Sequence, residues 1–479
     1  MLYYIILNNR LLNERKFVML SVLRWINENI LGLFLPALLF VSGAYFLLRI
    51  GRYTLRPLFA VKALSEKPDV SGNGKTPLSS LCLALAGTLG VGNITGVAGA
   101  IMIGGPGCVF WIWICAIVSA VLKFAETALA VHYRETDRSG NPAGGAHSYI
   151  KNGLGCPALA SFFCILCIFS SFTVGNMTQV RAAADGLSFA CGVPDIITAC
   201  VFLTAVLYLT VSNKDRISGF TAKIIPILCT GYVIAALCVI FILRDKLGEI
   251  TSLIIADAFT PRAGMSGFIG FLCSPALRLG IQRGIMSNEA GCGTAPIAHA
   301  GAVTDHPARQ GFLGIAEVLC DTLLLCTLTA YVILLSGAVP SGSSTELALN
   351  SFTSVLGNGI RYFLGAAIFL FALASVAGWA YYGRESLRAL GLGNRYYKIY
   401  GLIFACAAFA GCLIPEGPIW QLSDISISLM AIINVGALLM LAPTVTYLSK
   451  DFYLRRKQKN PEKSGKISSN TVKRTFFKS

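Results

Sequence analysis

Residues 284–296 read GIMSNEAGCGTAP, a polar and glycine-rich stretch inside a hydrophobic segment of the chain. A second stretch of this kind, GTLGVGNITG, occupies residues 87–96. Hydrocarbon offers no water to backbone N–H and C=O groups, so a membrane helix is opened only where a cavity or a ligand can satisfy them. Two interrupted helices in corresponding positions of two halves are typical of the binding site of a secondary transporter. The two stretches therefore predict two broken helices that meet at mid-membrane.

The composition of the chain predicts a protein that is inserted in a membrane. Of 479 residues, 55% are hydrophobic and 13% are charged, whereas soluble proteins carry about 25% charged residues. The chain is long enough for about eleven spans of about 20 residues. The sixteen cysteines fall mostly in hydrophobic runs, and we expect them to be reduced and buried. No cleavable signal peptide is evident, and Met19 is an alternative start to Met1.

The hydrophobic segments delimit the spans and their grouping. We expect spans at residues 30–50, 79–104, 107–132, 157–188, 192–212, 221–243, 266–299, 310–338, 360–383, 398–415 and 421–448. Residues 1–29 then form an N-terminal tail, 30–50 an additional helix, and 449–479 a basic, disordered tail. The other spans form two groups of five, at 79–243 and 266–448. Because five is odd, the groups have opposite orientations, as in the inverted repeat of the leucine-transporter-like fold.

The distribution of basic residues predicts the orientation. Segments that lie inside in this arrangement hold most of the lysines and arginines, whereas the outside loops hold only Arg244, Lys246, Arg262 and Arg361. This asymmetry places the C-terminus in the cytoplasm and the N-terminus outside, in the cell (inner) membrane. It also accounts for the net charge of +16 without a nucleic-acid partner. We expect a short surface helix within the loop 244–265.

The first stretch carries groups that suit an amino acid and a cation. Its glycines free the backbone and admit a ligand against it: Gly87, Gly90, Gly92 and Gly96. The N-termini of half-helices offer N–H groups to a carboxylate, and opened carbonyls with side-chain oxygens suit a sodium ion. Close helix packing through small residues is the alternative explanation. We expect the substrate to be bound by Thr88, Gly90, Gly92 and Asn93, and sodium by Gly87, Gly90 and Thr95.

The second stretch places three polar residues together at membrane depth. Polar and ionisable groups are costly there, so a functional role is the default interpretation. We expect Ser287 and Asn288 to bind the substrate. Glu289 is either functional as well, a structural partner of Arg283, or a residue near the membrane interface.

Candidates from other spans complete the expected site. Gln179 is an uncharged donor and acceptor that can meet both ends of an amino acid, while its neighbours Arg181 and Asp185 are spaced to pair with each other. Trp379 is expected to wall the pocket and limit substrate size, although a membrane tryptophan is more often an anchor or a packing element. Ser375 is expected to offer its hydroxyl to sodium between the second and ninth spans.

Other intramembrane charges are interpreted as structural. Lys123 and Glu126 are spaced to neutralise each other. Glu317 and Asp321, the latter followed by Thr322, lie one turn apart on one span and face either the bundle interior or its cytoplasmic mouth. The chain has no P-loop, no H-E-x-x-H and no G-x-S-x-G motif, so neither ATP-driven transport nor hydrolase chemistry has its parts. The sequence therefore indicates a transporter and not an enzyme.

The residues just described resemble the alanine or glycine:cation symporter family. The similarity covers the chain from about residue 30 to about residue 450. Matching stretches are residues 90–107, 110–111, 123–126, 175–177, 283–291, 306–307, 310–311, 321–322 and 378–383. The string R-G-x-x-S-N-E-A-G at 283–291 is the most specific of them.

This resemblance implies the broken-helix fold and symport of a small neutral amino acid with Na+. It also implies a pocket between the two broken helices that is lined by Gln179 and Trp379. The chain departs from the family at Val91, where a hydroxyl residue is usual, and at Ala374-Ser375, where two threonines are usual. The family's Gly-Gly-Pro-Met-Tyr-Tyr loop reads GGAHSY at 144–149.

The favoured hypothesis is sodium-coupled uptake of alanine or glycine across the lipid bilayer. Two alternatives remain open. One is a transport-inactive amino-acid sensor on the same scaffold, for which the departures at Val91 and Ser375 leave room. The other is proton coupling in place of sodium, since a buried Glu289 can titrate.

Overall fold

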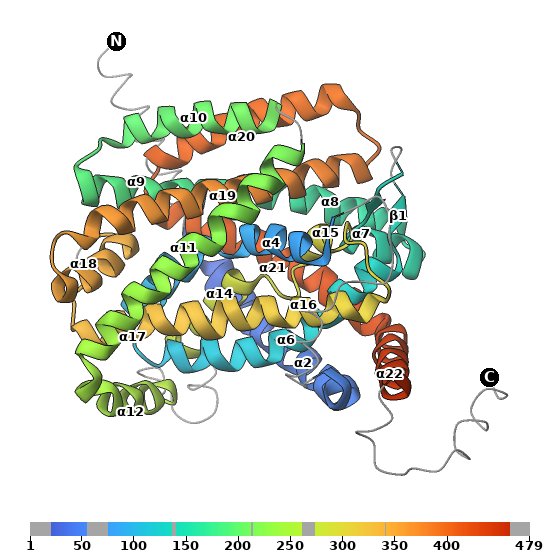
Figure 1. The fold of residues 1–479 in the computed structure, drawn as a ribbon, viewed down its shortest axis with the longest axis horizontal. Helices are drawn as coiled ribbons and strands as arrows, with labels where there is room; N and C mark the ends of the chain where they lie inside the picture. The colour runs from blue at the N-terminus through green and yellow to red at the C-terminus, as the bar shows by residue number, and fades with distance from the viewer. Residues whose placement is uncertain are drawn as a thin grey trace.

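The computed structural model describes residues 21–54, 75–136, 140–211, 214–260, 274–340 and 342–459. This part of the chain is helical except for one antiparallel pair of two-residue strands, β1 (Glu135–Thr136) and β2 (Pro142–Ala143). Most of the long helices run side by side, and the last one, α22, lies across them at one end (Figure 1). The expected tail at 1–20, the choice between Met1 and Met19, and residues 460–479 lie outside the described residues.

In chain order, the N-terminal helix comes first and is followed by the first half of the bundle. The helix Ser21–Thr54 consists mainly of η1 (Asn27–Leu31) and α2 (Gly32–Thr54). The first half follows with α4 (Pro77–Thr88), η2 (Val91–Asn93), α5 (Thr95–Gly104), α6 (Cys108–His132), α7 (Ala146–Ser148), η3 (Tyr149–Gly153), α8 (Pro157–Phe172), η4 (Thr173–Met177), α9 (Thr178–Cys191), α10 (Asp195–Val211) and α11 (Lys214–Ile242).

A short connecting segment and the second half complete the bundle. The connection holds η5 (Arg244–Lys246) and α12 (Leu247–Ala258), the surface helix expected within 244–265. The second half comprises α14 (Pro275–Asn288), α15 (Ala295–His299), α16 (Pro307–Val318), η6 (Leu319–Cys326), α17 (Thr327–Ser336), α18 (Ser344–Leu356), α19 (Ile360–Ala389), α20 (Asn394–Leu413), α21 (Glu416–Met440) and α22 (Ala442–Lys459).

Length and hydropathy confirm an all-helical membrane protein. In the described residues seven helices can cross a membrane, or up to nine if two strongly bent pairs each count as one span. The bent pairs are α4 with Val91–Gly104, at 59°, and Pro226–Ile242 with Arg244–Ala258, at 75°. The eleven spans expected from the sequence include two segments beyond these nine. They are α10, which is apolar but short, and the pair α14–α15, which is polar.

Both broken helices start in the same way. Thr76 accepts a hydrogen bond from the N–H of Ser79, and Pro77 occupies the first turn of α4. Ser274 likewise accepts from the N–H of Leu277, with Pro275 in the first turn of α14. A hydroxyl N-cap followed by proline is a strong helix start. The two halves therefore carry matching start signals at corresponding helices.

Helix α6 lies beside the second break and packs against both α14 and α16. Glycines allow this close approach, because a Cβ at Gly284 would lie 2.9 Å from the side chain of Cys115, and one at Gly311 would lie 2.6 Å from the ring of Phe124. Small residues at such crossings are the usual means of packing membrane helices. The packing brings the buried charges of α6 against the broken helix.

At both ends of the described chain, the structure differs from the tails that the sequence predicts. Residues 21–29, expected in the N-terminal tail, are helical and continue into α2. Residues 449–459, expected in the disordered tail, belong to α22. The ring of Phe452 is buried and packs on Phe312, and Asp451 pairs with His306 at 3.1 Å. Tertiary contacts thus order a segment whose composition is basic and polar.

Candidate functional site

The two broken helices meet through their side chains. The hydroxyl of Ser287, in the last turn of α14, lies 2.9 Å from the amide oxygen of Asn93 in η2. Asp321, in the π-helical segment η6, accepts from the amide of Asn93 at 2.5 Å and lies 2.5 Å from the hydroxyl of Ser287. All three side chains are buried. A single carboxylate therefore bridges the first and second breaks.

The junction of Asn93, Ser287 and Asp321 holds many side-chain oxygen atoms, and no basic side chain of the described residues pairs with its carboxylate. Thr322 donates to Asp321 at 3.1 Å and accepts from Asn288 at 3.1 Å. Ser287 has one proton, so its hydroxyl can satisfy only one of the two acceptors it faces. Across the described chain, no Lys, Arg or His nitrogen forms an ion pair with Asp321. A buried charge needs a partner, and clustered carboxylate, amide and hydroxyl oxygens suit a hard cation.

This junction is unlike a transition-metal centre. In the part of the chain that the structure describes, no group of three or more His, Cys, Asp or Glu side chains could hold a metal ion. The donors around Asp321 are instead the neutral oxygens of Asn93, Ser287 and Thr322. One negative charge among neutral oxygens fits a monovalent cation.

The first break lies between α9 and α19. A Cβ at Gly90 would lie 2.5 Å from Oε1 of Gln179 and 2.5 Å from Oγ of Ser375. Oε1 of Gln179 also accepts from the N–H of Val91 at 3.1 Å, and Ser375 donates to the carbonyl of Ala86 at 3.0 Å. The two residues expected from distant spans are thus brought to the opened backbone.

The remaining candidates of the first stretch line its two sides. Thr95 donates to the carbonyl of Val91 at 2.9 Å. Thr88 donates to Ala84 at 3.3 Å and lies 3.4 Å from Glu317. Gly87 packs against α19, where a Cβ would lie 2.8 Å from the hydroxyl of Tyr382. Gly92 is open, because a Cβ at this position would lie 3.9 Å from its nearest neighbour, the carbonyl oxygen of Met286.

Glu289 and Trp379 form one unit at the second break. Glu289 ends α14 with a positive φ of 50°, and Trp379 Nε1 donates to its Oε1 at 3.1 Å. Thr294 donates to its other oxygen at 2.5 Å. The indole is fully buried and packs on Gly175 of η4, where a Cβ would clash with it. Trp379 is therefore a buried wall between η4 and the second break.

The alternative roles considered for the charged residues are resolved by their partners. Arg283 does not pair with Glu289; it pairs with Asp424 at 3.0 Å and lies over the ring of Trp420. Arg181 pairs with Asp185, as its spacing predicts. Lys123 pairs with Glu126 at 3.8 Å, as expected, but its ammonium lies closer to Glu317, at 3.1 Å.

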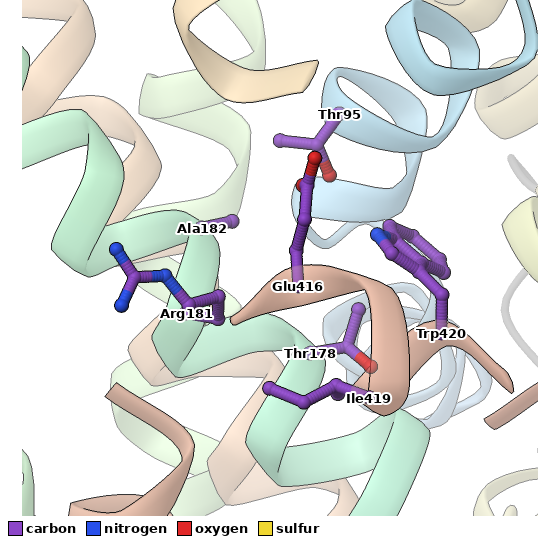
Figure 2. A pocket seen from close by; sticks show the side chains of 7 residues that line it. All are labelled: Thr95, Thr178, Arg181, Ala182, Glu416, Ile419 and Trp420. Atoms are coloured by element: carbon purple, nitrogen blue, oxygen red, sulfur yellow. The ribbon is translucent and has the colours of Figure 1, made fainter. Parts of the chain in front are cut away.

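A pocket adjoins the first break on the side expected to face outward. Thr95 at the start of α5 and Glu416 at the start of α21 line it (Figure 2). Figure 2 shows the Glu416 side chain directed toward Thr95, with the ring of Trp420 beside them. The space outlined by its residues, which includes open solvent, is about 200 Å³. Because Thr95 belongs to the first stretch, the pocket borders the first break on this side.

The opposite ends of the two broken helices are joined by backbone hydrogen bonds. The N–H of Lys75 donates to the carbonyl of Gly301 at 3.1 Å, and the N–H of Val303 donates to the carbonyl of Lys75 at 2.8 Å. These bonds form a parallel bridge between Lys75 and Ala302. Arg134 donates to the carbonyl of Ala302 at 2.5 Å. The side expected to face the cytoplasm is closed at this point.

Sequence reasoning missed two residues of this arrangement. The sequence predicts a structural role for both, with Glu126 as the partner of Lys123 and Asp321 one turn after Glu317. Glu126 does pair with Lys123, at 3.8 Å, but it also accepts from the backbone of the second break, at 3.1 Å from the N–H of Gly291. The signal that points to both residues is an ionisable side chain at membrane depth, but for Glu126 the spacing favours a local pair with Lys123.

A helical membrane protein whose broken helices meet at a buried oxygen cluster belongs to the class of secondary transporters with the leucine-transporter-like fold. A solved manganese transporter of Eremococcus coleocola (mutant H236A) shows the same fold, with a TM-score of 0.55 over 85% of this chain and 93% of that chain, at 13% identity. The chain belongs to the sodium:alanine symporter family, whose profile matches residues 16–466.

Two relatives show how far this similarity extends. The sodium/alanine symporter AgcS of Methanococcus maripaludis is 32% identical, over 91% of this chain and 98% of the relative. The probable sodium/glutamine symporter GlnT of Bacillus subtilis is also 32% identical, over 90% of both chains. The protein is thus a member of a family of sodium-coupled amino-acid symporters and not an enzyme.

Proposed function

We propose that this protein carries a small neutral amino acid, alanine or glycine, into the cell together with sodium by alternating access. The observation that carries the proposal is the junction of Asn93, Ser287 and Asp321, where both broken helices meet around one buried carboxylate. A cation at this junction neutralises Asp321 and draws the two breaks together. Its binding and that of the amino acid then favour each other reciprocally.

The opened backbone of the first break supplies the site for the amino-acid carboxylate. Gly90 and Gly92 leave the main chain accessible, and the N–H groups that follow belong to the start of a half-helix. Gln179 and Ser375 approach the same backbone from α9 and α19. In this proposal Gly87, Gly90, Thr95 and Ser375 hold a second sodium position, while Thr88 and Asn288 border the substrate.

The limited space at the site supports a small substrate. A single added carbon at Gly90 would already overlap Gln179 and Ser375. Trp379 is fully buried and fixed by Glu289, so its ring does not yield easily to a long side chain. AgcS is named for alanine and GlnT for glutamine, which makes glutamine the sharpest competitor to test.

Uptake into proteoliposomes tests the proposal. Labelled alanine, glycine and glutamine are offered with a sodium gradient or a proton gradient imposed separately. We expect concentrative alanine or glycine uptake only with sodium, and loss of that uptake in Asn93→Ala and Gln179→Ala with normal membrane insertion. Uptake driven by protons alone supports the proton-coupled alternative. Binding without uptake supports the sensor, and wild-type rates in both variants refute the assigned site.

A further inference from the structure

Helix α6 presents a buried ion pair to the second break. Lys123 and Glu126 lie one turn apart and are fully buried. The ammonium of Lys123 donates to the carbonyl of Asn288, the last residue of α14, at 2.7 Å. Oε2 of Glu126 accepts from the N–H groups of Gly291 at 3.1 Å and Gly293 at 3.2 Å.

The signs of the two charges match the backbone groups that they meet. The C-terminal end of a half-helix exposes carbonyls and attracts a cation, whereas free N–H groups attract an anion. In a membrane interior these groups have no water to bond. Lys123 bonds to the free carbonyl of Asn288, and Glu126 bonds to the free N–H groups of Gly291 and Gly293. Asn434 completes the arrangement by donating to Glu126 and to the carbonyl of Gly291, each at 2.9 Å.

The first break has no such support. Its backbone is bonded to neutral side chains, with Gln179 accepting from Val91 and Thr95 donating to Val91. Among the described residues, no charged side chain hydrogen-bonds to the backbone of residues 89–94. Charge-assisted hydrogen bonds are about twice as strong as neutral ones. The two breaks therefore differ in how firmly the protein itself holds them.

We infer that Lys123 and Glu126 are positioning residues that keep the second break unwound whether or not a substrate is bound. Glu126 occupies the N–H groups of Gly291 and Gly293, so these groups are not available to the carboxylate of an amino acid. The first break is then the one that binds that carboxylate and becomes ordered with the ligand. Only this last statement rests on the proposed function.

Amide hydrogen exchange of the full-length protein in lipid nanodiscs tests the inference. In the wild type we expect peptides covering 286–296 to exchange slowly, at equal rates with and without sodium and alanine. Peptides covering 87–96 should slow when both ligands are added. In Glu126→Leu without ligand, exchange in 286–296 should accelerate about 10- to 100-fold, the effect of losing a hydrogen bond to a charged group.

Two further variants separate positioning from general destabilisation. Glu126→Gln keeps an oxygen acceptor for Gly291 and Gly293 and should retain most of the protection. Lys123→Met should accelerate the same segment, because the carbonyl of Asn288 loses its cation. Glu385→Leu is the matched control, since Glu385 forms an i,i+3 ion pair with Arg388 on α19, and it should leave 286–296 unchanged.

The possible results are distinct. Unchanged exchange of 286–296 in Glu126→Leu overturns the inference, and so does an equal acceleration in peptides of α8. If Glu126→Leu accelerates 286–296 but alanine and sodium do not protect 87–96 in the wild type, the inference on the second break stands and the proposed substrate fails.

Discussion

The hydroxyl of Ser287 lies 2.9 Å from the amide oxygen of Asn93, although the two residues are 194 positions apart in the chain. Both face the carboxylate of Asp321. Each break contributes one neutral side chain, and a third element contributes the charge. A cation at this point would contact both halves of the protein at once, and this contact gives a physical route from ion binding to substrate binding.

Asp321→Asn should weaken sodium coupling. The substitution keeps the shape of the side chain but removes its charge, so the apparent KM for sodium should rise about 10- to 100-fold. The measurement is the sodium dependence of alanine uptake in proteoliposomes. Asp305→Asn, in the loop before α16, is a control that should leave the sodium dependence intact. An unchanged sodium KM in Asp321→Asn would remove Asp321 from the ion site.

Gly90→Ala should abolish uptake without preventing insertion. The new methyl would lie 2.5 Å from both Gln179 and Ser375, and overpacking of this kind costs about 1–3 kcal/mol. Gly436→Ala on α21 is the matched control, because no atom lies within 4 Å of its Cβ position. Alanine uptake per inserted molecule distinguishes them. Equal uptake by both variants would show that the first break has space for a methyl group at position 90.

The hydrogen bond between Trp379 and Glu289 should couple the two residues in stability. Trp379→Phe keeps an aromatic ring but leaves Oε1 of Glu289 without its N–H donor. A double-mutant cycle with Glu289→Leu, which removes the acceptor, should give an interaction free energy of about 1 kcal/mol or more. Thermal unfolding in detergent measures it. Additive effects of the two substitutions would contradict the contact.

Arg134→Ala should loosen the closure on the expected cytoplasmic side. Arg134 holds the carbonyls of Ala300 and Ala302 beside the bridge to Lys75. Its loss should raise the rate at which a membrane-impermeant thiol reagent modifies the buried Cys292 in inside-out vesicles, by about tenfold. Peptide mass spectrometry reads that site. Lys151→Ala, an exposed residue of the same face, should behave as wild type, and no difference between the variants would argue against a gate here.

The broken helices could be predicted from sequence because glycines and polar residues interrupt hydrophobic runs, a pattern that is local. Gln179 and Ser375 could be proposed because each places a polar side chain on a hydrophobic span. The structure brings both to Gly90. Asp321 could not be assigned to the junction, since its partner Asn93 is 228 positions away and the sequence around Asp321 indicated only a structural role. Residues 449–459 were expected to be disordered, because composition does not reveal the contacts that order α22.

The bridge that joins Lys75 to Ala302 is made entirely of main-chain atoms. Any amino acid except proline can provide such bonds, so positions 75 and 301–303 can change their side chains without losing the bridge as long as Arg134 stays in place. Mutational drift can therefore retune selectivity at the centre of the carrier while this distant contact between the broken helices is inherited.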